Sequence, residues 1–127
     1  MRTSEHLVEE RYISLGTFRR NGIRVDIPVW AAASDGRLYV FTAAGSGKVK
    51  RLRNSARAEL AGCNSRGRTH TDWVAASARI IQDAATIERA YAALRAKYGI
   101  WMRITDLLSR LSGRIRKRAI LEIEIAS

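Results

Sequence analysis

The chain has 127 residues, of which 46% are hydrophobic and 28% are charged, and these values predict one folded domain over residues 1–127 rather than a disordered chain. No apolar run reaches the ~20 residues that a membrane span needs, and no signal-peptide core follows the first residues, so neither a membrane-spanning nor a secreted protein is expected. The formal net charge of +11 favours an anionic partner: nucleic acid, a phosphorylated small molecule or an acidic membrane surface.

The first part of the chain reads as short strands joined by tight turns. Alternating apolar and polar residues predict strands over residues 11–18, 24–33 and 37–42. Asn21-Gly22 and Asp35-Gly36 are typical of the hairpin turns that join such strands. Pro28 inside the second strand indicates an edge strand or a bulge, because proline cannot donate a hydrogen bond to a neighbouring strand.

A short helix is expected after the third strand. Ser46 stands at an N-cap position, and a helix over residues 47–54 would point Val49 and Leu52 inward. Alternating residues then predict two further strands, at 56–64 and 72–81, separated by a polar loop.

The hydrophobic spacing then changes from that of a strand to that of a helix. Apolar side chains recur at helical spacing at Ile87, Ala90, Tyr91, Leu94 and Tyr98. Gly99 is expected to end this helix. The apolar stripe continues through Ile104, Leu107, Leu108 and Leu111, and residues 119–125 alternate as a closing strand. Together these elements predict an α+β fold with a six-stranded, mostly antiparallel β-barrel and short helices.

Residues 45–48, Gly-Ser-Gly-Lys, point to a phosphate site although they match no named motif. A P-loop and a dinucleotide fingerprint both fail, because required positions hold other residues. Lys48 and Arg51 lie on one face of the predicted helix, in its first turns, where cations oppose the helix dipole. A bound phosphate would offset that cost through free backbone N–H groups and these two side chains. The alternative interpretation is a solvated basic helix.

The densest charge in the chain is the run Arg-Ile-Arg-Lys-Arg at residues 114–118. A nucleic-acid patch is one interpretation, and a solvated turn between helix and strand is the other. The turn is the commoner role of such a run, so no specific nucleic-acid partner is expected.

No set of catalytic or metal-binding side chains stands out. His6 lies near the terminus, and His70 lies in a loop where Asp72 is a candidate partner. Cys63 is the one cysteine, which excludes an internal disulfide and a multi-cysteine zinc site and indicates a reducing cytoplasm; it is expected to be a small core residue. An enzyme built from this sequence would take its chemistry from an organic cofactor.

Three tryptophans remain as singular residues. Trp30 lies on the polar face of its predicted strand and is expected to cap a ligand or meet a partner. Trp73 begins a strand after a polar loop. Either could flank a planar ring, with packing in the core or at a dimer interface as the alternative. Trp101 is expected to pack among the helices.

Four segments, in this order, resemble the flavin-binding split-barrel family. They are residues 17–22 (Thr-Phe-Arg-Arg-Asn-Gly), 27–30 (Ile-Pro-Val-Trp), 36–42 (Gly-Arg-Leu-Tyr-Val-Phe-Thr) and 46–54 (Ser-Gly-Lys-Val-Lys-Arg-Leu-Arg-Asn). The chain is most similar to the actinobacterial branch that uses a deazaflavin, coenzyme F420, and that is distantly related to pyridoxamine 5'-phosphate oxidase. The resemblance covers residues 11–81 and extends through 107–111, Leu-Leu-Ser-Arg-Leu. It implies that the barrel is a split β-barrel.

The same resemblance implies a homodimer with two cofactor sites at its interface. The cofactor-binding residues that it implies are Val29, Trp30, Thr42, Ser46, Gly47, Lys48, Arg51 and Trp73. Lys48 and Arg51 would hold the cofactor phosphate, with hydroxyls added by the serine and the threonine. Val29 and Trp30 would line the ring, and Trp73 would approach the site, with the partner subunit as one origin.

Two departures from the oxidase pattern bear on the substrate. Pyridoxamine 5'-phosphate oxidases carry an arginine where this chain has Gly47, and they end in an arginine-containing substrate motif that residues 123–127 lack. Pyridoxamine oxidation is therefore not expected. The expected function is F420H2-dependent hydride transfer between the deazaflavin and an unsaturated small-molecule acceptor. The alternatives are an FMN-binding flavin reductase or oxidase, a non-catalytic cofactor-binding protein, and a basic nucleic-acid binder.

Overall fold

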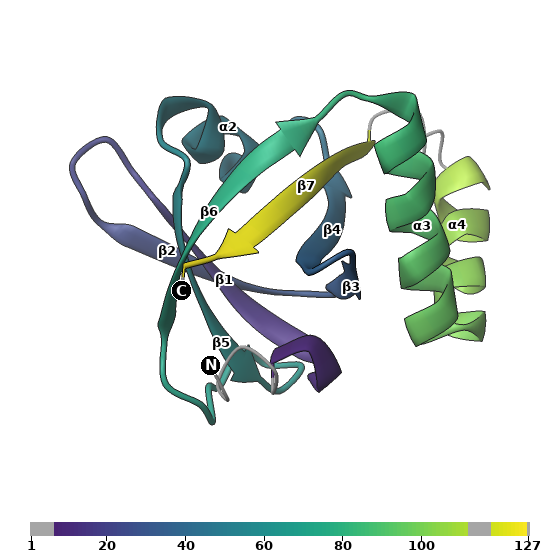
Figure 1. Ribbon diagram of the computed structural model, residues 1–127, viewed down its shortest axis with the longest axis horizontal. Coiled ribbons are helices and arrows are strands. Elements are labelled where there is room, and N and C mark those ends of the chain that lie inside the picture. The colour runs from purple at the N-terminus through teal and green to yellow at the C-terminus, as the bar shows by residue number, and fades with distance from the viewer. Residues whose placement is uncertain (1–6, 112–117, 127) are drawn as a thin grey trace.

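The computed structural model describes residues 7–111 and 118–126, which form one curled sheet with helices packed around it (Figure 1). The strands are β1 (Tyr12–Phe18), β2 (Arg24–Val29), β3 (Ala32–Ser34), β4 (Arg37–Ala43), β5 (Arg57–Cys63), β6 (Val74–Ile81) and β7 (Arg118–Ile125). The helices are α2 (Gly47–Asn54), α3 (Ala84–Tyr98) and α4 (Ile100–Leu111). The predicted α+β split barrel is confirmed.

The sheet has the strand order β2-β1-β5-β6-β7-β4-β3, and all its pairings are antiparallel. The prediction of one strand over residues 24–33 is wrong, and the described sheet therefore has seven strands rather than six. The chain leaves β2 after Val29, crosses at Trp30 and Ala31, and enters β3 at the opposite end of the sheet. Val29 and Ala31 both belong to the buried core, so inward and outward side chains keep alternating through the crossover. The sequence pattern therefore does not show that the strand ends there. Pro28 lies in an end strand, as predicted.

The main core fills the inside of the curled sheet. Its buried side chains include Ile13, Leu15, Val40, Leu60, Leu121 and Ile123. Helix α2 contributes Val49 and Leu52, as predicted. Helix α3 packs against β3 and β4 on the outside of the sheet, and it ends at Gly99, whose positive φ of 56° a side chain would disfavour. No helix in the described part of the chain is long and apolar enough to cross a membrane.

Helix α4 turns part of its apolar surface toward solvent. Met102 is buried in the cluster formed with α3, whereas Ile104 and Leu107 of the predicted stripe are exposed. Trp101 is 53% exposed, so it packs among the helices less than expected. The side chains of Leu108 and Leu111, and residues 112–117 with most of the basic run, lie outside the described residues.

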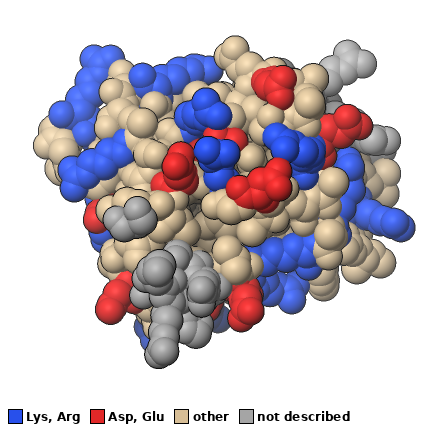
Figure 2. Space-filling view, viewed as in Figure 1, with Lys and Arg blue, Asp and Glu red and all other residues tan. Residues whose placement is uncertain are grey.

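Charged residues are organised differently in two regions of the surface. Over β6 and β7, acidic and basic side chains lie among one another, whereas only basic side chains appear near α2 and the β1–β2 turn at the upper left (Figure 2). In the first region Glu122 is buried, and it accepts hydrogen bonds from Tyr39 Oη (2.8 Å) and from Arg79 Nε (2.8 Å). Burial acts to raise the pKa of Glu122, but these hydrogen bonds and the nearby arginine charges outweigh it and hold the pKa below its ordinary value.

Replacing Glu122 by alanine should lower the free energy of unfolding by about 1–3 kcal/mol at neutral pH, because the buried Tyr39 hydroxyl loses its acceptor. Since the pKa is depressed in the folded state, the wild-type advantage should disappear as pH falls through that lowered value. The matched control is Glu124→Ala on the same strand, whose side chain is 65% exposed and should cost less than about 0.5 kcal/mol. Equal losses in urea titrations of the two variants would contradict this account.

Candidate functional site

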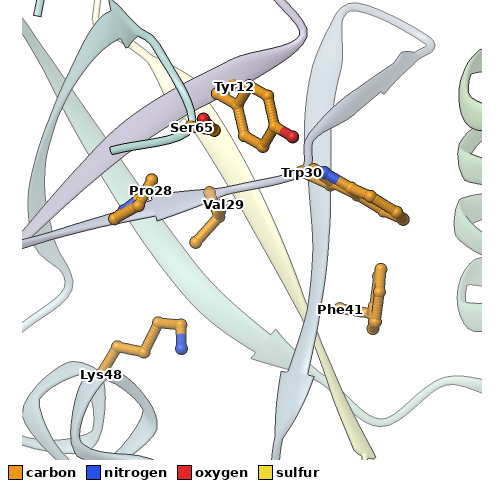
Figure 3. A pocket seen from close by; sticks show the side chains of 7 residues that line it. All are labelled: Tyr12, Pro28, Val29, Trp30, Phe41, Lys48 and Ser65. Carbon is orange, nitrogen blue, oxygen red and sulfur yellow. The ribbon is translucent and has the colours of Figure 1, made fainter. Parts of the chain in front are cut away.

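A cleft of about 320 Å³ lies beside the crossover between β2 and β3 (Figure 3). It is lined by Tyr12, Pro28, Val29, Trp30, Phe41, Lys48 and Ser65. Lys48 reaches in from α2 on one side, and Trp30 and Phe41 stand on the other. The cleft therefore combines an apolar, aromatic wall with one cation, which is a common composition for a site that takes a planar, charged ligand.

The aromatic wall is held in place by ring contacts. Trp30 meets Phe41 edge to face, with ring centroids 6.2 Å apart. On its other side Trp30 stacks on Tyr98 of α3, with centroids 4.6 Å apart and planes 10° from parallel. Such contacts stabilise one orientation of the indole, so this wall has a defined shape.

Lys48 lies in the first turn of α2 and has no hydrogen bond or ion pair with any described residue. Its side chain is half-buried, and that burial, followed by the charge of Arg51, lowers the pKa of Lys48. The first turn of the helix contains no acidic residue. A partly desolvated ammonium at a helix N-terminus is a favourable place for an anion.

Arg51 folds back over the same turn. Its Nε donates a 2.6 Å hydrogen bond to Thr17 Oγ1, while its Nη2 is buried without a partner among the described residues. Burial, followed by the charge of Arg19, lowers the pKa of Arg51. A Cβ placed on Gly47 would lie 2.8 Å from Arg51 Nη1, so the absence of a side chain at residue 47 leaves room for the guanidinium. A buried N–H without an acceptor is costly, so Nη2 keeps the capacity to donate to a further partner.

Two hydroxyl groups adjoin this cation pair. Ser46 is the N-cap residue, as predicted, but its side chain forms no hydrogen bond to the helix backbone. Its Oγ lies 3.5 Å from the Oγ1 of buried Thr42, a long contact that leaves both groups capacity for another partner. Thr42, Ser46, Gly47, Lys48 and Arg51 thus meet at one end of α2. This set of donors fits a phosphate group.

Of the residues expected at the site, Val29, Trp30 and Lys48 line the cleft, whereas Thr42, Ser46, Gly47 and Arg51 lie at the adjoining end of α2 without lining it, and Trp73 lies elsewhere. It lines a second cleft, of about 640 Å³, together with Arg24, Arg66 and Arg68 among others. The Arg24 guanidinium lies 3.8 Å from the centroid of the Trp73 ring. Within one chain Trp73 does not share the cleft of Lys48, and its role through a partner subunit stays a prediction.

The remaining candidates form structural contacts. His70 Nε2 lies 2.6 Å from Glu10 Oε1, so its partner is Glu10 rather than the candidate Asp72. Cys63 is buried, as expected, and burial raises the pKa of its thiol. The described residues contain no group of three side chains suited to a metal ion.

Sequence reasoning missed several residues of the site. Tyr12, Phe41 and Ser65 line the cleft, Thr17 anchors Arg51, and Tyr98 supports Trp30. Helical spacing identified Tyr98 as a core residue, which is correct. That spacing carries no information about Trp30, the crossover residue on which its ring stacks.

Comparisons with known proteins agree with this fold. The sequence profile of the pyridoxamine 5'-phosphate oxidase family matches residues 3–127. No curated protein sequence matches the chain. The structure is similar to the heme storage protein HutZ of Vibrio cholerae (TM-score 0.71, 11% identity, covering 100% of this chain and 92% of that one). It is also similar to a FAD-binding protein of Mesorhizobium loti (TM-score 0.63, 16% identity, covering 98% of this chain and 85% of that one). A third similar structure is that of an F420 reductase (TM-score 0.62, 13% identity, covering 97% of this chain and 93% of that one).

At these identities the similar structures support the fold alone, and the cofactors that they name differ. The profile match, in contrast, spans nearly the whole chain and agrees with the observed split barrel. The chain belongs to the pyridoxamine 5'-phosphate oxidase family.

Proposed function

We propose that the protein is an oxidoreductase that binds coenzyme F420, with the ring in the cleft beside Trp30 and the phosphate at the N-terminus of α2. The observation that carries the proposal is the buried Nη2 of Arg51 next to the ammonium of Lys48, neither of which has a hydrogen-bond partner among residues 7–111 and 118–126. An F420 reductase and a FAD-binding protein among the similar structures support a flavin or deazaflavin. FMN is the alternative cofactor.

Each part of this site has a physical task. Arg51, Lys48 and the hydroxyls of Ser46 and Thr42 would bind the phosphate, while Val29 and Trp30 would orient the ring and exclude water from it. The bound cofactor would supply hydride transfer to an unsaturated organic acceptor. No side chain is assigned as an acid, base or nucleophile.

The assembly proposed with this function is a cytoplasmic homodimer. A cleft of about 320 Å³ with a wide opening encloses only part of a tricyclic ring, and interfaces between subunits commonly complete such sites. The net charge of +11 is assigned to the phosphorylated cofactor rather than to nucleic acid. A non-catalytic carrier of the same cofactor is the second candidate, favoured by the heme storage protein among the similar structures.

Replacing Lys48 by alanine should weaken F420 binding by roughly 10- to 100-fold, because a charge-assisted contact of ~1.5–3 kcal/mol is lost. The matched control is Lys50→Ala, since Lys50 is exposed and lies on another face of the helix. In the wild type, affinity should also fall as pH rises through the lowered pKa of Lys48, and the Lys48 variant should lack this dependence. Fluorescence titration with F420 and with FMN measures both effects and identifies the cofactor. Unchanged affinity in the Lys48 variant would place the phosphate elsewhere.

A Gly47→Ala substitution should separate binding from stability. The new Cβ would displace Arg51, whose Nη1 lies 2.8 Å from that position, and cofactor affinity should fall about tenfold. The apo protein should melt within a few degrees of the wild type, because the preference for alanine over glycine in a helix, up to ~1 kcal/mol, offsets loss of the hydrogen bond from Arg51 to Thr17. Loss of thermal stability with intact affinity would contradict the proposed position of the phosphate.

Light scattering at micromolar concentration should find a particle of two chains. The expectation follows from the open cleft, which a second subunit would complete, and from two-fold symmetry as the commonest arrangement of such assemblies. A monomer that still binds F420 tightly would show that one chain suffices.

A further inference from the structure

Among the described strands, none pairs with the crossover between β2 and β3 to satisfy its backbone. Trp30 and Ala31 lie outside the paired residues of both strands, and Ala31 is fully buried. Buried backbone N–H and C=O groups require partners, since leaving them unpaired is costly. The partners of Ala31 come from the end of α3.

Two adjacent side chains of α3 hold the backbone of Ala31. Tyr98 Oη accepts a hydrogen bond from the Ala31 N–H at 2.9 Å, and its proton faces the carbonyl oxygens of Arg11 (2.9 Å) and Ala31 (3.0 Å). Lys97 Nζ donates to the carbonyl oxygens of Ala31 (2.6 Å), Glu10 (2.6 Å) and Val8 (3.1 Å). Both donors of the helix therefore connect the crossover to the segment that precedes β1.

The same tyrosine also supports the residue before Ala31. Its ring stacks on Trp30 at 4.6 Å with planes 10° from parallel, and Trp30 lines the cleft. Figure 3 shows the indole extending from the crossover toward the helical layer. Burial raises the pKa of Tyr98 to about 12, so its hydroxyl keeps its proton across the physiological range.

We infer that Tyr98 is a positioning residue of the cleft: its hydroxyl, together with Lys97, fixes the crossover, and its ring fixes the indole of Trp30 against which a planar ligand would lie. The inference rests on the proposed function for its effect on cofactor binding. Its effect on the crossover itself is independent of any ligand.

The chain offers a matched set of variants. Tyr98→Phe removes the hydroxyl and keeps the ring, Tyr98→Leu removes both, and Lys97→Met removes the ammonium and keeps most of the stem. Tyr91→Phe is the control, because Tyr91 lies on the same helix and its hydroxyl has no hydrogen bond to a described residue.

Hydrogen exchange of the Ala31 amide in the apo protein, followed by NMR, is the first measurement. Tyr98→Phe should speed this exchange by about tenfold, because the amide loses its acceptor, and the control should leave it unchanged. Near-UV circular dichroism is the second measurement. The spectrum should persist in Tyr98→Phe, where the stack remains, and weaken in Tyr98→Leu.

Titration with FMN and F420 is the third measurement. Cofactor affinity should fall about fivefold in Tyr98→Phe and Lys97→Met, and further in Tyr98→Leu.

Wild-type exchange at Ala31 in Tyr98→Phe would overturn the inference, as would equal changes in the Tyr91 control. If the wild type binds both cofactors but Tyr98→Leu binds them equally well, the positioning role fails and the proposed function stands. If the wild type binds neither cofactor, the proposed function fails, and exchange and dichroism still decide whether Tyr98 shapes the crossover.

Discussion

Two residues, Trp30 and Ala31, join strands that lie at opposite ends of the same curled sheet. Hydrogen bonds between strands cannot satisfy the backbone at that point, so side chains from α3 do so instead. The same helix packs against β3 and β4 through apolar clusters that include Ala90 and Leu94. Its Tyr98 also forms the stacked aromatic pair with Trp30 at the wall of the cleft. The shape of the candidate site therefore depends on the helical layer as much as on the barrel.

The charges of the protein fall into two groups with different consequences. Glu122 is buried but fully partnered by Tyr39 and Arg79, so its charge contributes to the folded state. Lys48 and Arg51 are partly desolvated, repel each other and oppose the dipole of α2, and they lack a compensating anion among the described residues. Proteins seldom keep such an arrangement without a ligand, because it costs stability. The second group is therefore where we propose that the ligand binds, whereas the first is structural.

The sequence predicts those features of the fold that depend on residues close together in the chain. Turns such as Asn21-Gly22, the helix stop at Gly99 and the inward residues of α2 all follow from short-range propensities. The break at residues 30–31 does not, because Val29 and Ala31 face the same core and preserve the alternation. The spacing of apolar residues also does not predict contacts between residues far apart in the sequence. Lys48 and Arg51 were predicted as a pair from their spacing, but the support of Trp30 by Tyr98 joins residues that no periodicity connects.

The central claim is that the N-terminus of α2 holds the phosphate of a flavin or deazaflavin. A crystal structure of the protein with bound F420 or FMN tests it most directly. The account predicts phosphate oxygens within hydrogen-bond distance of Arg51 Nη2 and Lys48 Nζ, with the ring beside Trp30. A phosphate bound elsewhere, with Arg51 Nη2 still without a partner, would contradict it.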